Sequence, residues 1–329
     1  MSVLTAGKLV ESVAEPPVAL WVELQAEMPP DLRETLDYKL GLEPIGGGYY
    51  LLAEQLSAER RGVEPSSTKL IETAPGTRLC FSYETQGLAR AVGAVDSLET
   101  TLAQMPRFHP GPEGLQAHLA SSTYYHALNV EPRSPVRVPQ QLGPAQLPGP
   151  NGEDLASCLF QLRETSRDDF GVVEDTLRAA FPGFERLEFP SVAAGTVAMA
   201  WRDRSFGRPL YMHQLSEGTL RFLWLTALLS SRSLPAITLL DEPEVSLHPE
   251  LLSLLAGLMR EASTRTQLIV ATHSDRLIRA LEPKEVVTFD LQDDGTATAA
   301  WADEHDLEEW LKEYTLDEVW RLGRIGGRS

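Results

Sequence analysis

The chain has 329 residues, of which 43% are hydrophobic and 23% charged, a composition typical of a globular protein with one large or two moderate domains. Its formal net charge of −18 argues against a surface built throughout for nucleic-acid binding, although a local basic groove would be compatible with it. The two cysteines, Cys80 and Cys158, predict neither a disulfide framework nor a metal knuckle, which indicates a reducing cytoplasm. The longest apolar stretch, residues 222–229, is too short to span a bilayer, and we expect no membrane partner.

The first part of the chain, residues 1–95, is expected to be an antiparallel β subdomain. Within residues 18–84, apolar and polar positions alternate, for example around Tyr38 and around Phe81, and turn signals separate the alternating segments. One of these turns contains three consecutive glycines, Gly46 to Gly48. No Lys-Ser/Thr follows them, so we interpret this segment as a turn and not as a phosphate loop.

The second part, residues 96–205, is predicted to be a helical lobe. Apolar residues recur at helical spacing in residues 96–128, and we place Tyr124 and Tyr125 on this helical segment as core residues. Histidines nearby leave a base-stacking or metal-binding patch as the alternative, but they lack a metal-ligand spacing. A Pro- and Gly-rich loop at 130–152 is followed by two predicted helices, within 155–162 and 170–181, and by two predicted strands, 186–189 and 196–201.

The third part, residues 206–303, begins with a segment that predicts a helix start. Ser216 is a candidate N-cap, because apolar residues recur at helical spacing from Leu220 to Leu228. Gly218 allows another backbone to approach closely, and a helix amino-terminus with Ser and Gly is suited to bind an anion. Many helices begin with Ser-x-Gly, however, so this segment alone is a weak signal.

A second segment of this part predicts a strand that ends in acids. Residues 237–240 are apolar or β-branched, which is typical of a parallel strand buried on both faces, and Asp241-Glu242-Pro243 follow directly. Ligands of open α/β sheets bind at the carboxyl ends of the strands. A carboxylate there can bind Mg²⁺, and its neighbour can activate a water molecule. The alternative is that Asp-Glu-Pro only ends the strand and begins a turn.

A third segment repeats this pattern with a histidine. The apolar run at 268–271 is followed by Thr272-His273-Ser274. We expect His273 to leave the sheet at the same edge as Asp241 and Glu242, where it can donate a hydrogen bond to a phosphoryl oxygen or to water. The alternative is a capping or core-edge histidine.

The carboxyl-terminal part, residues 304–329, is predicted to contain helices that dock on the core. Residues 307–314 carry apolar side chains at helical spacing, and Thr315 with Glu318 forms a capping-box pattern that starts a last helix. We expect Trp320 and Leu322 to pack this helix against the rest of the protein.

Taken together, the three segments of residues 206–303 are much more specific than any one of them. Their order, and the way the acid pair continues into Glu-Pro-Glu and Leu-His-Pro, resembles the carboxyl-terminal half of ABC-type ATPase heads, most closely those of the RecF-, SMC- and OLD-like class. The resemblance covers roughly residues 150–325. It implies an α/β fold with an ABC-type, P-loop NTPase-like parallel sheet core, an antiparallel β subdomain and a helical lobe.

The resemblance also implies roles for individual residues. Asp241 matches the Walker B acid that binds Mg²⁺, Glu242 the catalytic base and His273 the switch histidine. The signature motif, which in this class acts on the ATP of the other subunit, is matched by Ser216 and Gly218, and Ser246 falls in the D-loop. In this signature Glu217 and Thr219 replace the Gly and Gln common in transporters. The implied ligands are ATP and Mg²⁺, and the implied assembly is a homodimer or heterodimer through the nucleotide face.

The sequence contains no Gly-x₄-Gly-Lys-Ser/Thr phosphate loop. The nearest string, around Lys8, lacks the upstream glycine and the hydroxyl. A truncated form of a longer ATPase and a naturally nucleotide-defective head both fit this observation. We favour truncation, because the downstream catalytic positions are intact, and we expect hydrolysis by this chain alone to be weak or absent.

Two other functions stay open at this point. The chain could be a non-catalytic module that uses the fold to dimerise or to bind a partner. It could also be a metal-dependent nuclease that uses Asp241, Glu242, Glu244, His248 and His273. DNA repair, phage defence and chromosome maintenance all use heads of this class, so DNA or a nuclease or effector protein is a conceivable partner.

Overall fold

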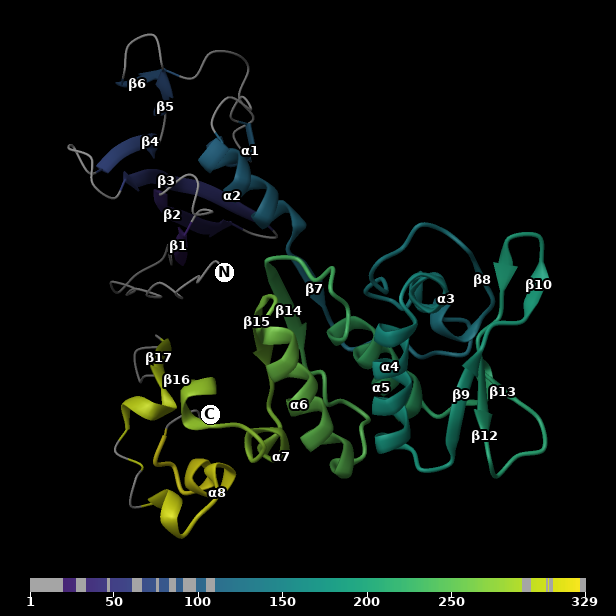
Figure 1. Ribbon diagram of the computed structural model, residues 1–329. Helices are drawn as coiled ribbons and strands as arrows, with labels where there is room; N and C mark the ends of the chain where they lie inside the picture. Colours follow the sequence, from purple (N-terminus) through teal and green to yellow (C-terminus); the bar gives the residue numbers. More distant parts are fainter. Residues whose placement is uncertain are drawn as a thin grey trace. The chain divides into compact units, whose positions relative to one another are not determined.

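The structure is a computed structural model that describes residues 20–27, 34–45, 48–60, 67–74, 77–82, 87–90, 99–104, 110–291, 297–305, 307 and 310–325 (Figure 1). Contacts divide the described residues into two compact units. The sheet unit contains those up to Ser121 together with Val287–Ala300, and the core unit contains Ser122–Val286 and Trp301–Ile325. In the part of the chain that the structure describes, every helix is too short or too polar to cross a membrane.

The sheet unit contains a six-stranded antiparallel sheet in which each strand pairs with the next one along the chain. This confirms the predicted antiparallel subdomain; the glycine turn at residues 46–47 and the turn at 75–76 lie outside the described residues. The strands are β1 (Leu20–Glu27), β2 (Glu34–Ile45), β3 (Gly48–Arg60), β4 (Ser67–Ala74), β5 (Thr77–Ser82) and β6 (Gly87–Arg90).

Alternation along these strands buries one set of side chains. Leu36 and Tyr38 on β2, Leu56 on β3 and Ile71 on β4 are buried together with Leu115 of helix α2 (Pro110–Ser121). A short helix, α1 (Thr101–Gln104), contacts β4 and α2. Later in the chain, β16 (Val287–Leu291) and β17 (Ala297–Trp301) form a separate two-stranded sheet.

The core unit is organised around a three-stranded parallel sheet in the order β15-β14-β7. Its strands are β7 (Thr123–Tyr125), β14 (Ile237–Asp241) and β15 (Gln267–Ala271). Parallel strands need crossover connections, and here helices lie between β7 and β14 and between β14 and β15. The core unit also contains small antiparallel sheets made of β9 (Phe184–Glu188), β12 (Ala200–Asp203) and β13 (Leu210–Tyr211), and of β8 (Gln140–Gln141), β10 (Ser191–Ala193) and β11 (Thr196–Val197).

The helices of the core unit are α3 (Leu155–Thr165), α4 (Arg167–Ala180), α5 (Glu217–Leu229), α6 (Leu252–Ser263), α7 (Asp275–Ile278) and α8 (Leu316–Arg321). Helix α5 is the most buried of them: from Leu220 to Leu229 its side chains are buried, except for the half-buried Arg221. The Trp224 ring meets that of Tyr125 of β7 edge to face at 5.6 Å between centroids. Packing on α3, α4 and α6 around this helix explains why its apolar positions extend beyond one face.

The predicted helical segment 96–128 is wrong at its end. Helix α2 stops at Ser121, and Tyr124 and Tyr125 belong to strand β7, which pairs with β14. Aromatic and β-branched residues favour strands, but three residues are too few for a recognisable alternation. The lobe predicted for 96–205 therefore supplies α2 to the sheet unit and β7, α3 and α4 to the core unit.

Three smaller expectations also need correction. Strand β15 is not buried on both faces: Ile269 is 49% exposed, and β15 is an edge strand among the described strands. Of the predicted helix at residues 307–314, residues 308–309 lie outside the described residues, and Trp310–Lys312 form a 3₁₀ turn. Thr315 does form the predicted capping box of α8, and Trp320 packs on the carboxyl-terminal cluster, but Leu322 is exposed rather than docked.

Candidate functional site

The carboxyl edge of the parallel sheet gathers the polar residues that follow its strands. Asp241 lies opposite Ala271 of β15, and Leu240 lies opposite Tyr125 of β7. The residues after the three strands, which include Glu242, His273 and His126, therefore leave the sheet at the same edge. This is the edge at which open α/β sheets bind their ligands.

Asp241 ends the central strand and receives a hydrogen bond from a neighbouring strand. The Tyr124 hydroxyl of β7 donates to Asp241 Oδ2 at 2.7 Å. This bond to a carboxylate raises the pKa of Tyr124 above its ordinary value of 10.0. Because Tyr124 is 52% exposed and Asp241 is half-buried, the carboxylate is fixed in direction but still open to a ligand.

Glu242 has a backbone conformation that costs energy. Its φ is +45°, in the left-handed region that residues with a Cβ rarely adopt, and its amide donates to the Ala271 carbonyl at 2.9 Å. Ser246, four residues on, also has a positive φ of 62°. Such residues cost about 1–3 kcal/mol each and cluster at functional sites. Glu242 is partly exposed and, among the described residues, its carboxylate has no side-chain hydrogen bond, so it is available for chemistry.

Hydrogen bonds connect the loops after β14 and β15 at the residues next to His273. The Thr272 hydroxyl donates to Glu244 Oε1, and the Ser274 amide donates to Thr272 Oγ1 at 3.0 Å. Ser274 also caps α7 by accepting a hydrogen bond from Leu277 N at 3.2 Å. His273 lies exposed between these two anchored residues. Its backbone is therefore held in place while its imidazole faces solvent.

The tip of helix α5 lies against the turn that follows Glu242. Ser216 is the N-cap, as predicted, and its Oγ accepts a hydrogen bond from Thr219 N at 3.1 Å. A Cβ added to Gly218 would lie 2.5 Å from the Ser246 carbonyl oxygen, so only glycine allows this approach. The structure thus brings Ser216, Gly218 and Ser246 together on one exposed surface.

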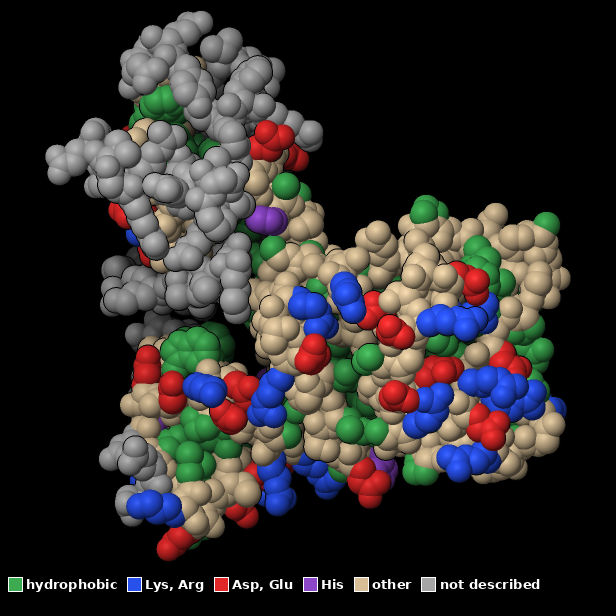
Figure 2. Space-filling model, viewed as in Figure 1, with side chains coloured by type: hydrophobic (Ala, Val, Ile, Leu, Met, Phe, Trp, Pro, Cys, Tyr) green, Lys and Arg blue, Asp and Glu red, His purple; other side chains and the backbone are tan. Residues whose placement is uncertain are grey.

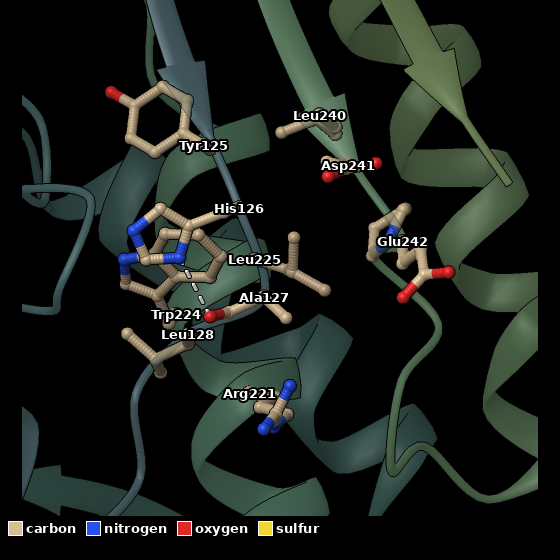
Figure 3. Close-up of a pocket in the computed structure, with 11 residues that line it drawn as sticks. Tyr125, His126, Ala127, Leu128, Arg221, Trp224, Leu225, Leu240, Asp241 and Glu242 are labelled. Carbon is tan, nitrogen blue, oxygen red and sulfur yellow. Dashed lines mark hydrogen bonds between the residues drawn. The ribbon is translucent and has the colours of Figure 1, made fainter. Parts of the chain in front are cut away.

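A small pocket connects the acid pair with helix α5 (Figure 3). It is lined by His126 after β7, by Asp241 and Glu242 after β14, and by Arg221 and Trp224 of α5. Arg221 Nε is buried without a hydrogen-bond partner in the described structure, and burial lowers the pKa of this guanidinium. The pocket therefore has acids on one side and an incompletely bonded cation on the other.

The donors at this edge suit a magnesium ion that is also held by phosphates and water. In the part of the chain that the structure describes, no three His, Cys, Asp or Glu side chains are placed to hold a metal by themselves. Mg²⁺ prefers oxygen ligands and often takes only one or two carboxylates from the protein. Asp241, with one oxygen fixed by Tyr124, fits that requirement.

Sequence reasoning missed three residues of this site. Tyr124 and His126 were assigned to a helical core segment, although Thr123-Tyr124-Tyr125 has the composition of a strand. Arg221 lies three residues after Gly218, and an arginine between Leu220 and the apolar run that begins at Phe222 was the available signal.

Comparisons with known proteins identify the family. A sequence model described as "AAA domain, putative AbiEii toxin, Type IV TA system" matches residues 81–279, which is more than half of the chain. No curated protein matches. Solved structures with similarity include an Smc head bound to the C-winged helix domain of ScpA (10% identity, 83% of this chain and 76% of that chain, TM-score 0.43). They also include the SMC head domain from Thermotoga maritima (12% identity, 80% and 73%, TM-score 0.36).

At identities this low and TM-scores below 0.5, the solved structures add no argument about the site. The family match does not depend on them. It spans β7, α5, β14 and β15, and so includes the whole edge described above. The chain belongs to this family of AAA-domain ATPases.

Proposed function

We propose that the chain is an ATP-binding and ATP-hydrolysing head of the ABC type, which acts as a head-to-head dimer. Asp241 binds Mg²⁺, and Glu242 takes a proton from the attacking water. The half-buried Asp241 carboxylate, fixed by Tyr124, and the partly exposed Glu242 beside it support these roles. Bound ATP would supply the phosphoryl group, and Mg²⁺ would neutralise the negative charge of its phosphates.

The same chain also carries the surface that acts on its partner's nucleotide. Ser216 and Gly218 present the amino-terminus of α5, where backbone N–H groups and the helix dipole favour a phosphate. Ser246 lies against this helix tip, only four residues after Glu242. This direct link between the acid pair and the helix tip is the observation that carries the proposal. His273, anchored on both sides and exposed, is proposed to hydrogen-bond the phosphoryl group or the attacking water.

The proposal predicts an asymmetry between the two roles. The sequence has no Gly-x₄-Gly-Lys-Ser/Thr string to hold phosphates beside Asp241 and Glu242. We therefore expect weak hydrolysis by this chain alone, and stronger hydrolysis with a partner head that supplies a phosphate loop. The reducing cytoplasm is the proposed location, since the two cysteines are free.

The two alternatives are less well supported. A metal-dependent nuclease would need several of its acids and histidines around a metal, and the described residues contain no such group. In addition, Glu244 is bonded to Thr272, and His248 caps its own turn by accepting from Glu250 N. A non-catalytic dimerisation module would not need the strained conformation of Glu242.

A first experiment measures ATP turnover with radiolabelled ATP at increasing protein concentration. Glu242→Gln should reduce turnover by about 100-fold or more, because it removes the general base. The matched control is Glu250→Gln, a nearby and highly exposed glutamate outside the proposed machinery. Equal turnover of wild type and Glu242→Gln would reject Glu242 as the base.

A second experiment tests whether each site combines two chains. Ser216→Asp keeps a good N-cap but places a negative charge where the partner's phosphate would lie. Alone, this variant and Glu242→Gln should both be inactive. Mixed in equal amounts they should recover about one quarter of wild-type turnover, because half of the dimers are hybrids and each hybrid has one intact site. A mixture as inactive as its components would exclude the shared-site dimer.

Surface charge and the family description bear on the partner and the process. On the face of the core unit in Figure 2, basic and acidic side chains alternate, without a continuous basic surface among the coloured residues. A DNA partner would need a surface elsewhere, whereas an effector protein would not. Of the processes served by such heads, defence agrees best with a family description that names a toxin–antitoxin system. Arrested growth on expression of the wild type, but not of Glu242→Gln, would support this role.

A further inference from the structure

The side chain of one arginine, Arg137, donates hydrogen bonds to two segments that lead to the candidate site. Arg137 ends a 3₁₀ turn in the loop that follows β7. Its Nε donates to the Val130 carbonyl at 2.6 Å, within its own loop. Its Nη1 lies 3.0 Å from the Leu215 carbonyl and 3.3 Å from the Met212 carbonyl, with the His213 carbonyl at 3.5 Å. The second set of carbonyls belongs to the turn directly before Ser216.

The chemistry of this contact suits an arginine. A guanidinium has five N–H donors in a rigid plane, so it can hold carbonyls from two segments in fixed directions, whereas the three donors of a lysine ammonium sit on one compact group at the end of a flexible stem. Arg137 is half-buried, and among the described residues its hydrogen bonds go to backbone carbonyls and not to a carboxylate. Two carboxylates, those of Glu131 and Glu217, line the same hollow as Arg137.

The two segments lead to the two halves of the site. The loop that contains Val130 begins at His126, which lines the pocket with Asp241 and Glu242. The turn at residues 212–215 leads directly into Ser216 and Gly218. Arg137 also lines a hollow of about 890 Å³ together with His213, Glu217 and Arg221, so the guanidinium is accessible from the side of the helix tip.

We propose that Arg137 is a positioning residue that fixes the turn before Ser216 and connects it to the loop at the acid edge. Within this turn the Leu215 amide donates to the Met212 carbonyl at 3.2 Å, and Arg137 adds side-chain bonds that connect the turn to the other loop. With Arg137 in place, the Ser216 cap and the Gly218 contact keep one orientation toward the partner's nucleotide. This role rests on the proposed function only for its catalytic consequence, not for its effect on the turn.

Hydrogen exchange tests the effect on the turn without any nucleotide. In Arg137→Gln, backbone amides of residues 213–220 should exchange about tenfold faster or more, while amides of α6 remain unchanged, because opening is local. Arg137→Lys should restore little of the protection, since the charge remains but the planar fork is lost. The matched control, Arg133→Gln, changes an exposed arginine of the same loop and should leave exchange as in the wild type.

Unchanged exchange at residues 213–220 in Arg137→Gln would overturn the proposal. So would a uniform increase across the core unit, because that result would make Arg137 a general stabilising residue. Full protection in Arg137→Lys would also overturn it, since charge alone would then be sufficient.

Mixed-chain turnover tests the catalytic consequence. Arg137→Gln should be defective alone but should recover about one quarter of wild-type turnover when mixed with Glu242→Gln, because its own acids remain intact and only the surface lent to the partner is disturbed. No recovery would overturn the positioning role. If the wild-type chain hydrolyses no ATP even with a partner head that supplies a phosphate loop, the proposed function fails, whereas the exchange experiment still decides the role of Arg137.

Discussion

Each unit of the molecule contains a tyrosine hydroxyl bonded to a carboxylate, and the two pairs differ in how completely the carboxylate is satisfied. In the sheet unit, Tyr38 donates to Glu54 Oε1 at 3.0 Å, and Glu54 is fully buried. It also accepts from the Thr101 amide at 2.5 Å and the Leu102 amide at 2.8 Å. In the core unit, Tyr124 donates to Asp241, whose carboxylate is only half-buried.

This comparison separates a structural acid from a candidate functional one. The donors around Glu54 come from β2 and from the start of α1, so its carboxylate joins α1 to the sheet and has no free access for a ligand. Asp241 and Glu242 lie where parallel strands end, with a tyrosine hydrogen bond to Asp241 and a strained backbone at Glu242. Complete hydrogen bonding of a buried acid indicates structure, whereas an accessible acid with unused lone pairs indicates a ligand site.

The largest effect on stability is expected at Glu54. Glu54→Ala would leave the Thr101 and Leu102 amides and the Tyr38 hydroxyl without a buried partner, and the free energy of unfolding should fall by about 3 kcal/mol or more. Urea unfolding measures this loss. Glu59→Ala, an exposed change on the same strand, should stay within about 0.5 kcal/mol of wild type. A small loss at Glu54 would contradict its structural role.

The next effect concerns the approach of Gly218 to Ser246. In Gly218→Ala the new methyl group would overlap the Ser246 carbonyl oxygen, which belongs to a backbone that cannot easily move, so we expect a loss of about 1–3 kcal/mol and of turnover in the partner site. Gly257→Ala in α6 is the matched control. Its Cβ would meet open space, and the change should stabilise the helix by about 0.5–1 kcal/mol. Thermal unfolding of both variants compares the two sites directly.

Glu242→Gly should produce the opposite sign from Glu54→Ala. Glycine adopts a positive φ at little cost, so this change should raise the free energy of unfolding by about 1 kcal/mol while abolishing the chemistry assigned to the carboxylate. Thermal unfolding and ATP turnover of the same preparation measure both quantities. A loss of stability would mean that the Glu242 side chain contributes to the fold and is not held in a strained position for function.

The sequence was informative where structure is local. Alternation within β2 to β5 predicts the antiparallel sheet because each strand pairs with its neighbour in the chain. Ser216 and Thr315 are recognisable as helix starts for the same reason: an N-cap bonds an amide two or three residues away. The apolar runs that precede Asp241 and Thr272 predict that the residues after them lie at one edge of the sheet, because parallel strands align their carboxyl ends.

What the sequence could not supply depends on long-range pairing. Tyr124 bonds Asp241 across 117 positions, and a strand of three residues has no periodicity that would predict this pairing. Arg137 bonds carbonyls about 75 residues away, and backbone carbonyls carry no sequence signal at all. The exposure of Ile269 follows from the position of β15 at the edge of the described sheet, which its own apolar sequence does not reveal.

The smallest expected effect is a change in the pKa of Tyr124. It tests the hydrogen bond at the carboxyl edge of the parallel sheet without nucleotide. The hydrogen bond to Asp241 raises the pKa of Tyr124 above 10.0, so Asp241→Asn, which removes the anionic acceptor, should lower that pKa toward its ordinary value. Because the folded-state pKa is the raised one, the contribution of this bond to stability is complete below pH 10 and is lost as the pH rises through the raised value.

The Tyr124 ring-carbon NMR signal, assigned with Tyr124→Phe, reports the titration. Tyr38 provides the internal reference: burial, and then Glu54, raises its pKa as well, and Asp241→Asn should leave it unchanged. An unaltered Tyr124 titration in Asp241→Asn would mean that the two residues are not bonded in solution, and the fixed orientation of Asp241 on which magnesium binding depends would then be lost.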